Sequence, residues 1–145
     1  MLTGLHYPAT RYDPAPLVDL SVQAERARLS RSALTAFFNI MQRWSVRDAD
    51  ARQMLGGIAA STLYDYKRNP QRVLDQDKLT RISYLIGIFK ALHILHREDL
   101  ADRWVAMPNR NRIFGGATPL RYMVQGGAPA MQTVRRLLDA RRGGA

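Results

Sequence analysis

Residues 76–96, QDKLTRISYLIGIFKALHILH, decide the fold of this chain. Apolar residues recur in them every three or four positions, which is the period of an α-helix, and Asp75 stands where an N-terminal cap is expected. The apolar positions cover more than one face of this helix. Such a helix needs two partners. We expect one side to pack on the preceding helices, and the other on the carboxyl-terminal segment or on a second copy of the chain.

The segments on both sides of this helix also follow helical spacing, so the sequence predicts an all-α fold. On the amino-terminal side we expect four helices, over about residues 17–29, 32–44, 46–55 and 59–68. Ser32 is the expected cap of the second helix, and Ser45 stands three residues before Asp48, the spacing of a capping box that begins the third. Gly56-Gly57 is expected to end the third helix.

The carboxyl-terminal side contains the signals for three more helices. A short helix over about residues 98–105 is expected to end at Pro108. Thr118-Pro119 has the cap and first-turn proline that begin a helix, and Gly126-Gly127 predicts its stop. Pro129 then begins a last helix, whose apolar face carries Met131, Val134, Leu137 and Leu138.

The composition limits the kinds of protein that this sequence encodes. Of its 145 residues, 46% are hydrophobic and 23% are charged, which is typical of a globular chain and excludes global disorder. Cysteine is absent, so disulfides, thiol catalysis and cysteine-based zinc sites are excluded. The longest apolar run is too short to cross a bilayer, and residues 1–16 lack the pattern of a secretory signal. We therefore expect an irregular arm over residues 1–16 and a cytoplasmic protein without a membrane partner.

The charge is unevenly distributed along the chain. The formal net charge is +10, from 22 Lys and Arg against 12 Asp and Glu, which favours an anionic partner. Residues 47–72 hold five basic residues against three Asp, whereas residues 103–145 hold eight Arg against one Asp. Arginine suits phosphates and carboxylates alike. The carboxyl end is therefore expected to bind nucleic acid or an acidic protein surface, or else to be an ordinary solvated face.

The stretch DADARQMLGGIAASTLYDYKR, residues 48–68, resembles a DNA-binding helix–turn–helix with a turn one residue longer than usual. In that motif the outer residues of the second helix enter the major groove. Hydroxyl groups, an aromatic ring and basic side chains at these positions suit contacts with bases and phosphates, whereas Asp65 fits less well. An ordinary helical hairpin with a solvated polar face is the alternative. The candidate DNA contacts are Ser61, Thr62, Tyr64, Lys67 and Arg68.

No constellation of residues for catalysis or metal binding is visible in the sequence. His93 and His96 lie three residues apart, but no third ligand stands at a suitable spacing. We find no pairing of a nucleophile with a base, and no glycine loop that would hold a phosphate. The expectation is a protein that is not an enzyme and has no cofactor and no metal. A third hypothesis is a small hydrolase or transferase. The absence of a catalytic constellation in the sequence counts against it.

The carboxyl-terminal string WVAMPNRNRIFGGATPLRYMVQGGAPAMQTVRRLLDA, residues 104–140, resembles the signature of the MbcA/ParS/Xre antitoxin family. The likeness lies in a tryptophan, a Pro-Asn loop, a glycine before Pro-Leu, a Gly-Gly pair and a terminal helix. The helix–turn–helix of residues 48–68 is similar to the Xre-like half of the same family. The resemblance therefore covers roughly residues 30–145.

The resemblance implies an antitoxin that binds and inhibits a RES-domain toxin, an NAD-degrading or ADP-ribosylating enzyme encoded by the adjacent gene. It also implies a homodimer, in a higher-order complex with the toxin, that represses its own operon by binding operator DNA. On this basis the chain divides into an arm (1–16), a DNA-binding region (17–75), a connecting and dimerisation helix (76–96) and a toxin-binding domain (97–145). A repressor without a toxin partner is the main alternative.

The basic residues near the carboxyl end suggest where the toxin is contacted. Because a RES toxin binds an anionic dinucleotide, we expect the last helix and the Gly143-Gly144-Ala145 tail to cover the entrance of its active site. Deletion of residues 135–145 is then predicted to abolish inhibition and to leave DNA binding intact. The candidate toxin contacts are Asn109, Arg110, Arg112, Phe114, Arg135, Arg136, Arg141 and Arg142.

Overall fold

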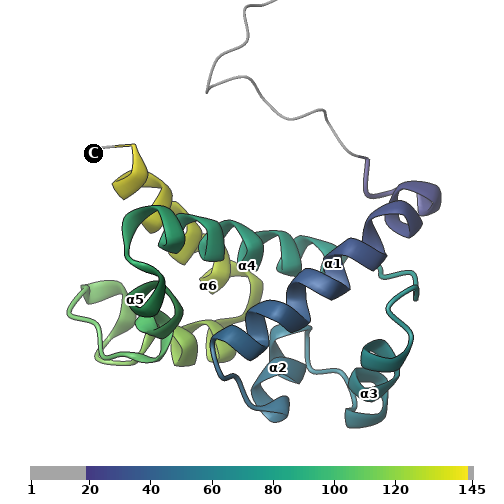
Figure 1. Ribbon diagram of the computed structural model, residues 1–145, viewed down its shortest axis with the longest axis horizontal. Helices are drawn as coiled ribbons and strands as arrows, with labels where there is room; N and C mark the ends of the chain where they lie inside the picture. Colours follow the sequence, from purple (N-terminus) through teal and green to yellow (C-terminus); the bar gives the residue numbers. More distant parts are fainter. Residues whose placement is uncertain (1–18, 144–145) are drawn as a thin grey trace, which may run out of the picture.

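The computed structural model describes residues 19–143, which contain helices and no strand. The all-α fold class is therefore confirmed, while the expected arm over residues 1–16 lies outside the described residues. Figure 1 shows α1, α4 and α6 crossing in the body of the molecule, with α2 and α3 on one side and α5 on the other. The elements are α1 (Gln23–Arg43), α2 (Asp48–Met54), α3 (Ala60–Arg68), α4 (Gln76–Leu95), α5 (Glu98–Arg103), the 3₁₀ turns η1 (Trp104–Ala106) and η2 (Arg112–Phe114), and α6 (Pro119–Arg142).

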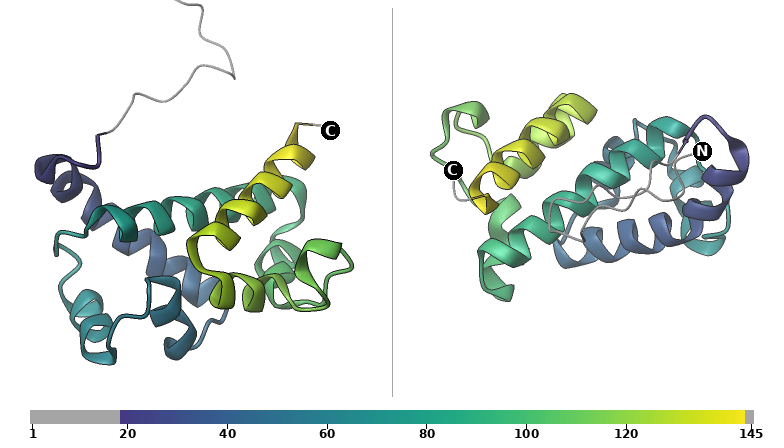
Figure 2. Two further views of the ribbon diagram at one scale, coloured as in Figure 1. Left: turned by 180° about the vertical axis from the view of Figure 1, so that it is seen from behind. Right: turned by 90° about the horizontal axis from the view of Figure 1, so that it is seen from above.

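Helix α4 is the centre of the fold. It packs against α1 on one side and against α6 on the other, as the view from above in Figure 2 shows. Ile82, Leu85 and Ile88 are completely buried, which confirms the prediction that this helix has two covered apolar faces. The structure places α1 and α6 of the same chain on these faces, so the two apolar faces do not by themselves require a second copy. The expectation that α4 is a dimerisation helix stays a prediction.

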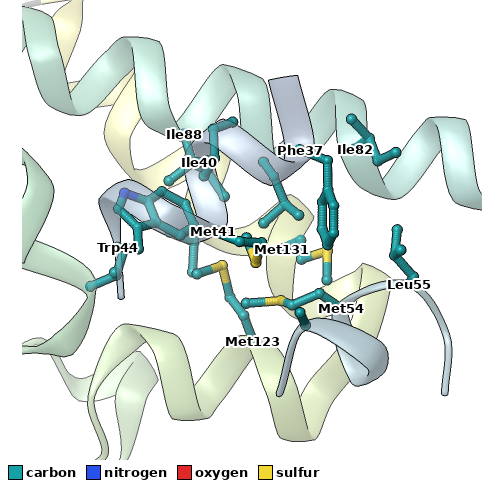
Figure 3. Packing of buried hydrophobic residues seen from close by; sticks show 14 of the residues in the cluster. Phe37, Ile40, Met41, Trp44, Met54, Leu55, Ile82, Ile88, Met123 and Met131 are labelled. Atoms are coloured by element: carbon teal, nitrogen blue, oxygen red, sulfur yellow. The ribbon is translucent and has the colours of Figure 1, made fainter. Parts of the chain in front are cut away.

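One core unites the amino-terminal and carboxyl-terminal halves of the chain. Figure 3 shows side chains of α1, α2, α4 and α6 meeting beside Trp44. Four methionines lie at this junction, and each is at most 4% exposed. Thioether side chains suit such a junction because they are unbranched and adapt to irregular space. These methionines are Met41, Met54, Met123 and Met131.

Helix α1 differs from the prediction at both of its serines. The expected break at Ser32 is wrong, because α1 runs without interruption from Gln23 to Arg43. The Ser32 hydroxyl donates a hydrogen bond to the carbonyl of Leu29 within the helix, and so does not cap a new one. The expected cap at Ser45 is also wrong. Ser45 adopts a left-handed conformation (φ 55°) and ends α1, with its amide bonded to Gln42 and that of Val46 bonded to Met41, which is a Schellman motif.

The caps of α4 and α6 agree with the prediction. The Asp75 carboxylate accepts a hydrogen bond from the amide of Lys78, and the Thr118 hydroxyl accepts one from the amide of Arg121. The predicted stop at Gly126-Gly127 is a kink, because Gly127 has non-helical angles (φ 69°, ψ −152°) and helical bonding resumes at once. Within the described residues, no helix is long and apolar enough to span a membrane.

Candidate functional site

Helices α2 and α3 form the predicted hairpin, and the two glycines between them make the turn. Gly56 and Gly57 both have positive φ (94° and 84°), and their amides bond to the carbonyls of Gln53 and Arg52. Glycine is the residue that adopts this conformation without strain. The Arg52 guanidinium then donates to the carbonyl of Ile58 at 2.8 Å, which ties the end of the turn back to α2. The long turn expected from the sequence is thus an ordered part of the hairpin.

The outer face of α3 carries the predicted DNA contacts. Ser61 and Arg68 are exposed, Thr62 is half-buried, and Tyr64 is 61% exposed, the highest fraction but one among the large apolar side chains described. The Arg68 guanidinium lies 5.6 Å from the centre of the Tyr64 ring, so these two side chains support each other at the surface. An aromatic ring with a cation beside it is a surface suited to bases and phosphates.

Two charged residues of α3, Lys67 and Asp65, interact with neighbouring side chains. The ammonium of Lys67 lies 3.0 Å from a carboxylate oxygen of Asp48 on α2 and also stacks over Phe38. Asp65, which fitted the sequence prediction poorly, receives hydrogen bonds from Arg72 and Asn69 at 2.9 Å. The hydrogen bond from Arg72 is the main cause that lowers the pKa of Asp65. Its carboxylate therefore stays ionised, and the Arg72 guanidinium beside it offsets part of the negative charge on this face.

The loop that contains four of the predicted toxin contacts is held by aromatic packing and by two asparagines. The side-chain oxygen of Asn109 accepts a hydrogen bond from the backbone amide of Asn111. The side-chain oxygen of Asn111 accepts one from the backbone amide of Ile113. Below the loop, the ring of Phe114 meets Trp104 and Tyr122 edge-on, with centroids 6.2 and 5.3 Å apart. Phe114 is 3% exposed and packs in the core, so only a small part of its ring is open to a partner. Arg110 and Arg112 are exposed.

The second half of α6 carries the other predicted arginines. Arg136, Arg141 and Arg142 are exposed. Arg135 is half-buried, and its side chain crosses α4 at Gly87, where a Cβ atom would come within 2.5 Å of the Arg135 Nε. It also donates to the carbonyl of Ser83 at 3.4 Å. Arg135 therefore has a packing role, and only part of its side chain is available to a partner.

The arginine-bearing loop and the carboxyl end of α6 lie at the same end of the molecule, and α3 lies at the other (Figures 1 and 2). We call Arg110, Arg112, Arg136, Arg141 and Arg142 the arginine end. Beside the kink of α6 is an open cleft of about 380 Å³, lined mainly by Phe114, Tyr122, Pro129 and Ala130. A cationic surface next to an apolar cleft suits a protein partner with acidic and apolar groups.

An ion pair that no sequence pattern indicated joins the two halves of the chain. The Arg121 guanidinium on α6 donates to both carboxylate oxygens of Asp50 on α2, at 3.3 and 3.1 Å, and Asp50 is only 7% exposed. These residues are 71 positions apart, so a pattern of local spacing cannot predict that they form a pair.

A second cluster that the sequence did not indicate surrounds His93. His93 lies 3.1 Å from a carboxylate oxygen of Asp102, and the Asp102 carboxylate also accepts a hydrogen bond from Arg43. Among residues 19–143, no group of three His, Asp or Glu has the arrangement of a metal site.

Comparisons with known proteins give a match for each half of the chain. Residues 22–87 match the family described as the antitoxin Xre-like helix-turn-helix domain, and residues 90–144 match the antitoxin Xre/MbcA/ParS C-terminal toxin-binding domain. The uncharacterized protein y4oB of Sinorhizobium fredii (strain NBRC 101917 / NGR234) is 37% identical over 130 residues, which cover 89% of this chain and 98% of that protein. No solved structure matches the chain. With both domains matched in order along one core, the chain belongs to the Xre/MbcA/ParS family of antitoxins.

Proposed function

We propose that this antitoxin belongs to a type II toxin–antitoxin system and neutralises a RES-domain toxin, an enzyme that degrades NAD or ADP-ribosylates. In this proposal the arginine end covers the toxin's active site in the cytoplasm, by stoichiometric binding without turnover. The observation that carries it is the cluster of exposed arginines on the loop and on α6, within the segment that matches a toxin-binding domain. These cations suit acidic groups on the surface of the toxin around the entrance of its active site.

Charge reversal at the arginine end tests the toxin contact. Arg136→Glu, Arg141→Glu and Arg142→Glu together should lower affinity for the RES protein of the adjacent gene by at least about 100-fold, because like charges would face each other. Co-purification and titration calorimetry measure this. Arg28→Glu with Arg31→Glu on α1 is the matched control and should keep wild-type affinity. A triple variant that still binds and protects cells would refute the assignment, and NAD turnover by the purified antitoxin alone would refute its non-enzymatic role.

This test replaces deletion of residues 135–145. The deletion removes Leu138, which is completely buried, and Arg135, which packs across α4. Loss of a buried leucine costs about 2–5 kcal/mol of folding free energy, so the truncated chain would lose function for reasons unrelated to the toxin. The exposed arginines change the surface and leave the core intact.

We also propose that α3 reads the operator of the antitoxin's own operon. Arg68→Ala should weaken binding to all duplexes and reduce the slope of log K against log salt by about 0.9, the value for one phosphate contact. Lys67→Ala should act in the same direction, but it also breaks the ion pair with Asp48, so Arg68 is the cleaner test. Arg97→Ala, at the start of α5 on the other end of the molecule, is the control. An unchanged slope for Arg68→Ala would mean that another surface meets the DNA.

A homodimer is the assembly that suits a two-fold operator, and we propose that a second copy covers the open groove between α1 and α4. The groove has a volume of about 640 Å³ and is lined mainly by Leu20, Leu29, Ala33, Ala36, Leu79 and Ile86. Light scattering at micromolar concentration should give twice the chain mass, and Ala36→Glu should give the monomer. A wild-type monomer would contradict this assembly.

A further inference from the structure

The hairpin that carries α3 is attached to the toxin-binding half of the chain. Helix α2 has only seven residues, and a helix of this length is stable only when it packs against the rest of the chain. It packs on the first half of α6, where Met54 meets Met123 in the core and Arg121 binds Asp50 at both carboxylate oxygens. A two-bond pair of this kind fixes direction as well as distance. The orientation of α2 is thus set by α6.

Helix α3 follows α2 through contacts inside the hairpin. The turn is tied to α2 by Arg52, and Lys67 of α3 pairs with Asp48 in the first turn of α2. Leu63 of α3 is 2% exposed and belongs to the common core. A rotation of α2 on α6 would therefore carry the outer face of α3 with it.

A second contact links the turn of the hairpin to the kink of α6. A Cβ atom placed on Gly56 would lie 3.6 Å from the Arg81 guanidinium carbon, and one placed on Gly127 would lie 3.8 Å from Arg81 Nη1. The Arg81 side chain is itself held by Asp77 at 2.9 Å. Arg81 therefore lies between the glycine turn and the glycine kink, and it supports the same arrangement as Asp50 and Arg121.

We propose that Arg121, through Asp50, is a positioning residue for operator recognition. Arg121 touches no base in this proposal. It sets the angle at which α3 presents Ser61, Tyr64 and Arg68, and so contributes to the choice of sequence more than to the attraction for phosphates. The inference rests on the proposed DNA-binding function of α3. It makes operator recognition dependent on a residue outside residues 22–87, the part that matches a helix–turn–helix domain.

The test compares two duplexes of equal length, one from the promoter region of the antitoxin gene and one with the same bases in shuffled order. The double variant Asp50→Asn with Arg121→Gln avoids leaving a buried charge unpaired. Its affinity for the promoter duplex should fall about tenfold. Its affinity for the shuffled duplex should stay within about twofold, because Lys67 and Arg68 are unchanged. Arg121→Lys, which keeps the charge and loses the paired geometry, should show a smaller loss in the same direction.

The matched control is Arg43→Gln with Asp102→Asn, which removes the 2.9 Å ion pair between α1 and α5, together with the contacts of Arg43 with Glu98 and of Asp102 with His93. None of these contacts involves a residue of the hairpin. This control should keep the preference for the promoter duplex. Amide hydrogen exchange, read at residues 48–68, supplies a measurement that does not depend on DNA. The rate of amide exchange in residues 48–68 should rise in the double variant and in Arg121→Lys. The urea midpoint of each of these variants should stay near the urea midpoint of the control variant.

Three outcomes separate the possibilities. A wild-type chain that does not prefer the promoter duplex contradicts the proposed function of α3, and the hydrogen-exchange arm still decides whether Arg121 orders the hairpin. A wild-type chain with the preference, and folded variants that keep it unchanged, overturns the positioning role. An equal loss on both duplexes also overturns it, since that is the result of a general loss of structure. If the double variant does not fold, Arg121→Lys decides in its place.

Discussion

Asp75 determines where the central helix begins. Its carboxylate accepts a hydrogen bond from the amide of Lys78 and lies 2.8 Å from the ammonium of the same residue. Asp75→Ala removes both interactions with Lys78. It should lower the free energy of unfolding by about 1 kcal/mol, measured by urea titration. Asp75→Asn keeps an oxygen that caps the helix, so at neutral pH it should cost less. Equal costs for the two variants would show that capping is not the source of the stabilisation.

The same residue gives the stability a dependence on pH. Burial raises the pKa of Asp75, but hydrogen bonds from the Lys78 side chain and backbone lower it by more, so the folded pKa lies below the unfolded value of about 3.9. A lowered pKa stabilises the folded state above the unfolded value, and this contribution is lost as the pH falls through the folded pKa. Asp75→Asn should therefore show a flatter fall in stability than wild type between about pH 5 and pH 2. A parallel fall would assign the acid sensitivity to other carboxylates.

Single residues show what a sequence can and cannot reveal. Asp75 and Thr118 were predictable as caps because a cap acts on an amide three residues away. Ser45 matched a capping pattern as well, but the chain uses it to end α1, since the core position of Trp44 requires the chain to reverse there. Phe114 reads as an exposed loop aromatic, and only the folded loop brings Trp104 and Tyr122 against it.

At the scale of elements, the kink of α6 is the feature whose effect on folding stability is the most direct to measure. Gly127 has φ 69° and ψ −152°, a region that side-chain-bearing residues avoid. Gly127→Ala should destabilise the chain by about 1–3 kcal/mol, which thermal or urea unfolding measures. Gly143→Ala is the control, because Gly143 has φ −75° and room for a Cβ atom. It should stay within about 0.5 kcal/mol of wild type. A neutral Gly127→Ala would mean that α6 straightens at little cost.

The helices themselves were largely predictable, since apolar spacing and turn residues are local. The error in α1 has a local cause too. Ser32 was expected to begin a helix, but a serine whose hydroxyl bonds back to a carbonyl of its own helix is tolerated within it. For α4, the pattern indicated two covered faces without saying which partners cover them, because that depends on how the chain returns after residue 118.

At the scale of the whole molecule, the two matched domains share one hydrophobic core. Met123, Met131, Val134 and Leu138 of α6 are completely buried, and Met54 of α2 lies at the same junction. We therefore expect the full chain to unfold in one cooperative step, with coincident transitions by far-ultraviolet circular dichroism and tryptophan fluorescence. A chain that ends at residue 97 should show no cooperative transition. A cooperative unfolding step in that fragment would establish an independent amino-terminal domain.

The long-range pairs explain why the candidate surfaces were found and their connection was not. Exposed positions of α3 and the arginine-rich tail follow from residue type and helical period, which are properties of short segments. The contact between Asp50 and Arg121 depends on the path of the chain over 71 residues, and no spacing rule describes that path. The sequence therefore indicated two candidate surfaces, and it treated α4 as a connecting helix although α4 packs against both α1 and α6 in one core.

The shared support has a consequence for hybrids between relatives. A recombinant that takes α2 and α3 from one antitoxin and α6 from another combines side chains at positions 50 and 121 that were never matched to each other. Such a chimera would recover the donor's operator preference only when position 121 travels with the hairpin. Engineers who wish to redirect DNA binding by this antitoxin should therefore transfer the residues of α6 that face α2, although they lie in the other half of the gene.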